Sequence, residues 1–152
     1  MPIVVPEPSK DERTMAFLAH LLQAFSSFIG PLVIFCVRQD SRFVRFHALQ
    51  CLIVQGCYMV LVFGTMFLFV GGLFWELAHH PEHAQMPPTA MLIIVPVFWL
   101  ISMGGWVVNL ILGVVYGLKA NRGEWAGYPL IGKWLMPNFA VPAQPQPSTK
   151  IA

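Results

Sequence analysis

The chain has 152 residues, of which 57% are hydrophobic and only 11% are charged, and its formal net charge is +2. Soluble domains carry about 25% charged residues, so this composition is typical of a membrane protein and leaves no room for a separate catalytic domain outside the membrane. The basic residues do not gather with exposed aromatic residues, and we therefore expect no nucleic-acid partner.

The N-terminal tail, residues 1–13, mixes acidic and basic residues and shows no signal-peptide pattern, so we expect it to be retained. Three stretches that follow contain no Asp, Glu, Lys or Arg, namely Thr14 to Val37, Phe46 to Trp75 and His83 to Leu118. Because roughly 20 apolar helical residues cross a hydrocarbon core of about 30 Å, each stretch is long enough to span a bilayer. The sequence predicts an all-α membrane domain over 14–136, a bundle of three transmembrane helices at about 14–37, 48–75 and 91–118.

The first stretch contains Gly30 and Pro31, and a proline inside a helix removes a backbone donor and crowds the preceding turn. We expect a kink there. The alternative is a re-entrant half-helix, which is tolerated at membrane depth when it packs against protein. That alternative would place the N-terminus in the cytoplasm.

Most basic residues beside the spans lie on one predicted side, at Arg38, Arg42, Arg45, Lys119, Arg122 and Lys133, whereas Lys10 and Arg13 precede the first span among three acidic residues. The link 76–90 has no Lys or Arg, so the positive-inside rule predicts a bacterial inner-membrane protein with its N-terminus outside and its C-terminus in the cytoplasm. Asp40 and Ser41 look like the N-cap of the second helix, and the helix dipole disfavours cations in a first turn. We therefore expect anionic lipid headgroups beside Arg42 and Arg45.

Polar residues inside the spans share helix faces, at His20, Gln23 and Ser27 in the first span and at Gln50 and Gln55 in the second. They are either hydrogen-bonding contacts between helices or the lining of a polar cavity for a substrate or proton. In the third span small or polar residues recur every four positions, at Gly105, Asn109, Gly113 and Gly117. Such a helix-packing seam lets another helix approach closely, so we expect self-association or other membrane proteins as partners.

No pattern for catalysis, a cofactor or a metal is present. Cys36, Cys51 and Cys57 lack metal-ligand spacing, and Pro81 interrupts the histidine-rich link around His79, so we predict neither a metal site nor an enzyme.

Residues 123–136 interleave aromatic residues with Lys133, as interfacial segments do, and residues 137–152 form a Pro- and Gln-rich tail that we expect to be disordered.

Four strings carry a resemblance to a known family: KDERTMAFLAHL from Lys10, GPLVI from Gly30, DSRFVRFHALQ from Asp40 and GLKANRGEWAGYPLIGKW from Gly117. They resemble a bacterial family of small membrane proteins of unknown function that is grouped with the twenty-kilodalton Tic-type component of the chloroplast inner-envelope import channel. The motif positions are Phe43, Val44, His47, Gln50, Gly123, Glu124, Tyr128 and Pro129. The resemblance implies a small helical membrane protein without an established activity, whose chloroplast relatives have four spans and take part in protein translocation.

The sequence thus favours a non-enzymatic integral membrane protein that binds other membrane proteins as a scaffold or accessory subunit, with translocation suggested only by the resemblance. The alternative is a subunit of a small-solute or ion channel or transporter that uses His20, Gln23 and Gln55.

Overall fold

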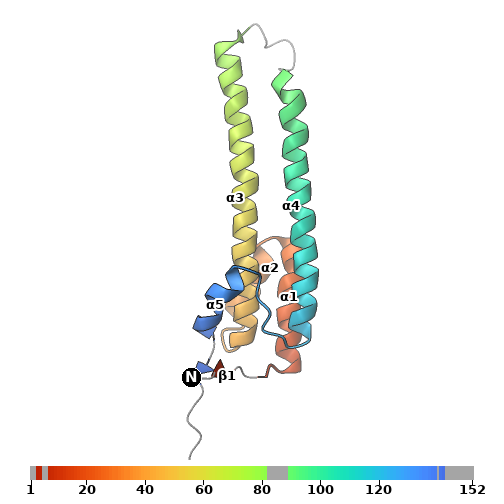
Figure 1. Cartoon of the computed structure of the whole chain (residues 1–152), viewed down its shortest axis with the longest axis vertical. Coiled ribbons are helices and arrows are strands. Elements are labelled where there is room, and N and C mark those ends of the chain that lie inside the picture. Colours follow the sequence, from red (N-terminus) through yellow and green to blue (C-terminus); the bar gives the residue numbers. More distant parts are fainter. Residues whose placement is uncertain (1–2, 5–6, 82–88, 140, 143–152) are drawn as a thin grey trace, which may run out of the picture.

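The computed structural model describes residues 3–4, 7–81, 89–139 and 141–142, and these residues are mostly helical. The elements in chain order are β1 (Ile3–Val4), α1 (Lys10–Ser26), α2 (Ile29–Val37), α3 (Arg42–His79), α4 (Thr89–Asn121), α5 (Ile131–Phe139) and β2 (Val141–Pro142). Figure 1 shows α3 and α4 as long neighbouring rods, with α1, α2 and α5 gathered along one half of them. The helical class is as predicted, apart from the short antiparallel pair β1–β2.

Two helices among the described residues are long and apolar enough to cross a membrane, over Arg42–His79 and Met91–Asn121. Their most apolar stretches are not buried by the rest of the protein. The prediction of three spans is therefore not confirmed, and the difference lies in the first apolar stretch.

That first stretch folds as a hairpin of two helices rather than as one kinked helix. The break comes at Ser27, whose φ is 57°, and Pro31 lies in the first turn of α2. A first-turn residue has no intrahelical acceptor for its N–H, so proline is tolerated there. Gly30 is required because a Cβ atom would collide with Ser26 Oγ and Leu22 Cβ. The hairpin agrees with the alternative that this stretch does not cross the membrane as a single helix.

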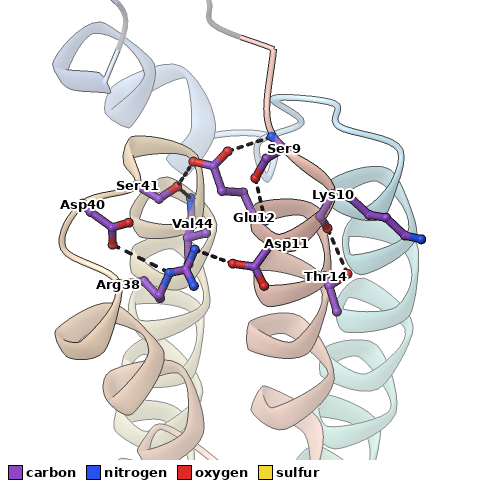
Figure 2. A network of polar contacts seen from close by, with 9 residues as sticks. All are labelled: Ser9, Lys10, Asp11, Glu12, Thr14, Arg38, Asp40, Ser41 and Val44. Atoms are coloured by element: carbon purple, nitrogen blue, oxygen red, sulfur yellow. Dashed lines mark hydrogen bonds and ion pairs between the residues drawn. The ribbon is translucent and has the colours of Figure 1, made fainter.

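Polar contacts tie the start of α1 to the link between α2 and α3 (Figure 2). Arg38 Nη2 lies 2.7 Å from Asp11 Oδ2, and the Ser41 hydroxyl donates to Glu12 Oε1 at 2.6 Å. The start of α1, this link and the end of α4 therefore share one end of the molecule, and Figure 1 shows the same arrangement. The predicted orientation, with the N-terminus outside and the C-terminus in the cytoplasm, is therefore not confirmed.

We call the part of the bundle where α1 and α2 flank α3 and α4 the wide half; it contains residues 42–58 of α3 and 105–121 of α4. The narrow half is the remainder of the two long helices, residues 59–79 and 89–104.

Local sequence explains the helix starts in the wide half. Ser9 and Glu12 form a reciprocal capping box at α1, since the Ser9 side chain accepts from the Glu12 N–H and the Glu12 carboxylate accepts from the Ser9 N–H. Ser41 caps α3 by accepting from the Val44 N–H at 3.2 Å. The predicted cap at Asp40 and Ser41 is thus formed by Ser41.

The segment after α4 turns back along the bundle. Gly123 has a φ of 85°, a value that glycine adopts without steric cost, and α5 then packs on α3. The predicted interfacial segment 123–136 is an irregular loop followed by most of α5. The predicted disordered tail 137–152 begins inside α5, continues into β2, and otherwise lies outside the described residues.

Candidate functional site: a buried polar network

Polar side chains from α1, α3, α4 and the following loop meet inside the wide half. Each of them is at most 5% exposed: His20, Gln23, His47, Gln50, Gln55, Asn109 and Tyr128. The polar faces predicted on the first two spans are therefore brought together, and Asn109 and Tyr128 join them.

One branch of this network is a chain of amides. The Tyr128 hydroxyl donates to Gln23 Oε1 at 3.3 Å, and the Gln23 amide donates to Asn109 Oδ1. Asn109 Nδ2 donates to Gln55 Oε1 at 2.7 Å, and Gln55 Nε2 donates to Ser27 Oγ at 2.9 Å. Every donor in this branch points the same way along the chain of amides. The branch connects α1, α4 and α3 to one another and to the hairpin turn at Ser27.

The second branch is a histidine pair. His47 Nε2 lies 3.2 Å from the Glu124 carbonyl oxygen, which only accepts, so this nitrogen carries the proton. His47 Nδ1 is then an acceptor for His20 Nε2–H at 3.1 Å. Because the Tyr128 hydroxyl donates its proton to Gln23, His20 Nδ1 accepts from the Cys51 thiol at 3.2 Å, and the Tyr128 oxygen lies 3.0 Å from the same nitrogen. Both rings are satisfied in their neutral forms.

The geometry of this network is better suited to holding the helices together than to binding a metal ion. His20 uses opposite ring nitrogens toward His47 and Cys51, so one metal ion cannot bind all three side chains. Within the described part of the chain, no group of three or more His, Cys, Asp or Glu is arranged to hold a metal ion. Buried networks that are fully hydrogen-bonded rigidify a core and specify its packing.

The glycine seam of α4 lies against the chain's own helices. A Cβ at Gly113 would lie 3.0 Å from the His20 carbonyl oxygen, and one at Gly117 would lie 3.2 Å from both His20 Cβ and the Phe17 ring. Gly105 meets the Tyr58 ring in the same way, at 2.9 Å. Within this chain, the seam glycines lie against α1 and α3.

The sequence motifs that carry the family resemblance contact each other in the structure. The backbone N–H of Tyr128 donates to Gln50 Oε1 at 2.8 Å, and the Glu124 carbonyl meets His47. Phe43 packs edge-on against Trp125, with ring centroids 5.2 Å apart. The motif positions therefore form one interface, which also contains the buried Val44 and includes Gly123 and Pro129 in its loop. Spacing along the helices alone did not predict the role of Tyr128, although its place in the fourth string, which begins at Gly117, was a signal.

The predicted basic residues have different surroundings. Arg38 is paired with Asp11, the ammonium of Lys119 lies 5.1 Å from the Tyr116 ring centroid, and Lys133 lines a cavity of about 450 Å³ beside α5. Arg42 and Arg122 are exposed, and Arg45 is partly buried.

Hydrogen bonds shift two pKa values at the end of the wide half. The Ser41 hydroxyl and the Ser9 backbone N–H hold the pKa of Glu12 below its ordinary value. The hydrogen bond to Asp11 raises the pKa of Arg38. Both shifts favour the charged forms that close this end of the hairpin.

Together, the apolar long helices and the sealed polar core define a small helical membrane protein in which polar groups hold the helices together. The profile of the magnetosome magnetite crystal formation protein family matches residues 11–135, and the chain belongs to this family. No curated protein and no solved structure matches the chain. The expectation of a small membrane-protein family is thus confirmed, whereas these comparisons give no link to the Tic-type import component.

Proposed function

We propose that this protein takes part in magnetite crystal formation as a non-enzymatic integral protein of the magnetosome membrane, acting as a scaffold or accessory subunit. The observation that carries the proposal is the family match over residues 11–135, nearly the whole helical domain. The sealed core supports a structural role, because its polar groups bind one another rather than a ligand.

The orientation we propose places both described ends of the chain in the cytoplasm. Arg45 and Glu76 are separated along α3 by about 46 Å at 1.5 Å per residue, close to the 40–45 Å of a bilayer with its headgroups. The arginines of the wide half then lie at the cytoplasmic surface. The hairpin α1–α2 enters the membrane from that side and turns back at Ser27.

A channel or transporter role has less support. His20, Gln23 and Gln55 are hydrogen-bonded within the network, and the cavities at the α3–α4 contact, at the start of α1 and beside α5 are not lined by them. Partner proteins would instead meet the exposed apolar surface of the narrow half, where Phe67 is 77% exposed and Leu68 is 74% exposed.

Deletion of the gene in a magnetite-forming host tests the function. We expect altered crystal size or shape by electron microscopy, rescue by the wild-type gene, and poor rescue by Asn109→Leu. The matched control is Ser102→Ala on the same helix. This variant should rescue fully, because the Ser102 hydroxyl has no hydrogen-bond partner among the described residues. Unchanged crystals in the deletion strain would contradict the proposal.

Green fluorescent protein fusions test the orientation, because this reporter does not fluoresce after export in an unfolded state. We expect fluorescence from fusions at both termini and none from an insertion after Pro81. Fluorescence from the C-terminal fusion alone would restore the three-span topology.

A further inference from the structure

Two arginines at the start of α3 lack the acidic partners that their neighbour has. Arg38 contacts Asp11 and Asp40, at 2.7 and 3.7 Å. Arg42 and Arg45 make no ion pair within the described ranges, and Arg45 Nε is buried without a hydrogen-bond acceptor. Arg38 Nε is buried without an acceptor as well, so it is the missing ion pairs that distinguish Arg42 and Arg45 as positions that favour an anion.

We propose that Arg42 and Arg45 bind the phosphate of one anionic phospholipid in the cytoplasmic leaflet. The site rests on the orientation proposed above and goes beyond the role in crystal formation.

The helix itself adds to the need for a bound anion. Arg42 is the first residue of α3 and Arg45 follows within the first turn, where the positive end of the helix dipole opposes cations. Residues three apart share a helix face, so both guanidinium groups can reach one headgroup. Guanidinium groups bind phosphate through paired N–H donors.

The acids near Arg42 are already engaged. Glu7, Glu12 and Asp40 line a cavity of about 280 Å³ together with Arg42. Glu7 pairs with Arg13 at 3.0 Å, and Asp40 with Arg38. The Glu12 carboxylate accepts from Ser9 and Ser41, as Figure 2 shows. Among the residues that the structure describes, these contacts leave Arg42 without an ion pair.

An apolar surface continues from Arg45 into the membrane. The Arg45 guanidinium carbon lies 5.1 Å from the centroid of the Phe35 ring on α2. Leu32 follows on the same face of α2, and Phe28 directly precedes this helix; the two side chains are 40% and 46% exposed. On α3, Gly56 is exposed with open space where a Cβ would lie.

This surface decides between a lipid and a soluble anion. From Arg45 to the level of the hairpin turn it runs about 15 Å along α3, a length that an acyl chain can follow. A free phosphate ion would gain nothing from the apolar strip, so a phospholipid is the occupant that uses both parts of the site.

Lipid binding to the full-length protein, measured by native mass spectrometry from detergent, tests the proposal. Phosphatidylglycerol is compared with phosphatidylcholine, for the wild type and for the double variant Arg42→Gln with Arg45→Gln. Each arginine near an anionic lipid contributes about 5-fold in affinity, so we expect the preference for phosphatidylglycerol to fall by about 25-fold. The matched control is Lys119→Gln with Arg122→Gln, which removes the same charge at the end of α4 and should keep the preference.

Thermal unfolding in the same detergent establishes that the double variant is folded; if it is not, the single variant Arg45→Gln is used, with an expected loss of about 5-fold. An equal loss in both double variants would show attraction by net charge alone and would overturn the site. Displacement of the lipid by millimolar inorganic phosphate would overturn the lipid as its occupant. A wild-type protein that binds both lipids equally would also contradict the proposal.

Discussion

The wide and narrow halves of this bundle use the same two helices in opposite ways. In the wide half, α3 and α4 present buried amides, imidazoles and glycines to α1 and to each other. In the narrow half they keep their apolar side chains on the outside and meet through contacts such as the Phe69–Phe98 stack, with ring centroids 6.4 Å apart. Both halves expose apolar side chains to their surroundings, but only the wide half also has a buried polar core.

The arrangement of the helices is specified mainly in the wide half. Lipid tails are as apolar as leucine, so apolar contacts alone discriminate weakly between packed and separated helices in a membrane. Hydrogen bonds and close backbone contacts require one particular arrangement, and this chain places them in the wide half. Substitutions should therefore cost much more in the wide half than in the narrow half.

The largest effect is expected for Gly113→Leu. The added side chain would overlap the His20 carbonyl oxygen, so α1 and α4 must separate and the network between them opens. We expect a loss of about 3 kcal/mol in the free energy of unfolding, measured by denaturation in detergent micelles. Gly104→Leu is the matched control on the same helix, since no atom lies within 4 Å of its Cβ position, and it should change stability by less than about 0.5 kcal/mol. Equal losses of stability in the two variants would contradict the expectation that substitutions cost more in the wide half than in the narrow half.

Asn109→Leu is expected to cost about 2 kcal/mol. The substitution leaves the Gln23 amide and the Gln55 carbonyl without their partners in a buried position. The comparison is Thr65→Val in the narrow half, whose hydroxyl bonds only to carbonyls of its own helix, and we expect little change there. Denaturation midpoints of the two variants provide the measurement, and a neutral Asn109→Leu would contradict a structural role for the amide chain.

Ser41→Ala should cost about 1 kcal/mol, because it removes the N-cap of α3 and the donor to Glu12. A restoring variant, Ser41→Asp, keeps the cap but places a second carboxylate beside Glu12, so it should recover stability only partly. Full recovery would show that the contact with Glu12 contributes nothing.

The smallest effect concerns pH. Because the folded pKa of Glu12 is below its unfolded value, its contribution is present at neutral pH and is lost as pH falls below about 4.5. Thermal unfolding midpoints between pH 3 and 7 should therefore fall less steeply for Glu12→Gln than for the wild type. Parallel curves would show that other groups set the acid sensitivity.

The sequence was sufficient for the helical class, the location of the two long helices and the cap at Ser41. It was not sufficient for the hairpin, since Pro31 fits equally well in a kinked helix or in the first turn of a new one. That choice depends on the close packing of Gly30 against the end of α1 and on the ion pair between Asp11 and Arg38. Both are contacts between α1 and the segment that runs back beside it.

The candidate site was likewise predictable only in part. Helix periodicity placed Gln23 and Gln55 on inward faces, but it could not show that Asn109 lies between them or that Tyr128 meets His20. The glycines of α4 indicated that another helix packs closely there, but not which helix it is. Periodicity assigns a face to each residue, and only tertiary structure decides which face lies opposite.

The turn at Ser27 has a geometrical consequence for the bilayer. With the hairpin confined to the wide half, the protein has a larger cross-section at the arginine-rich surface than at the end near His79. In the orientation proposed above, such a shape displaces more lipid from the cytoplasmic monolayer than from the opposite one. It fits with least strain where the cytoplasmic monolayer is convex, as on the outer surface of a small vesicle.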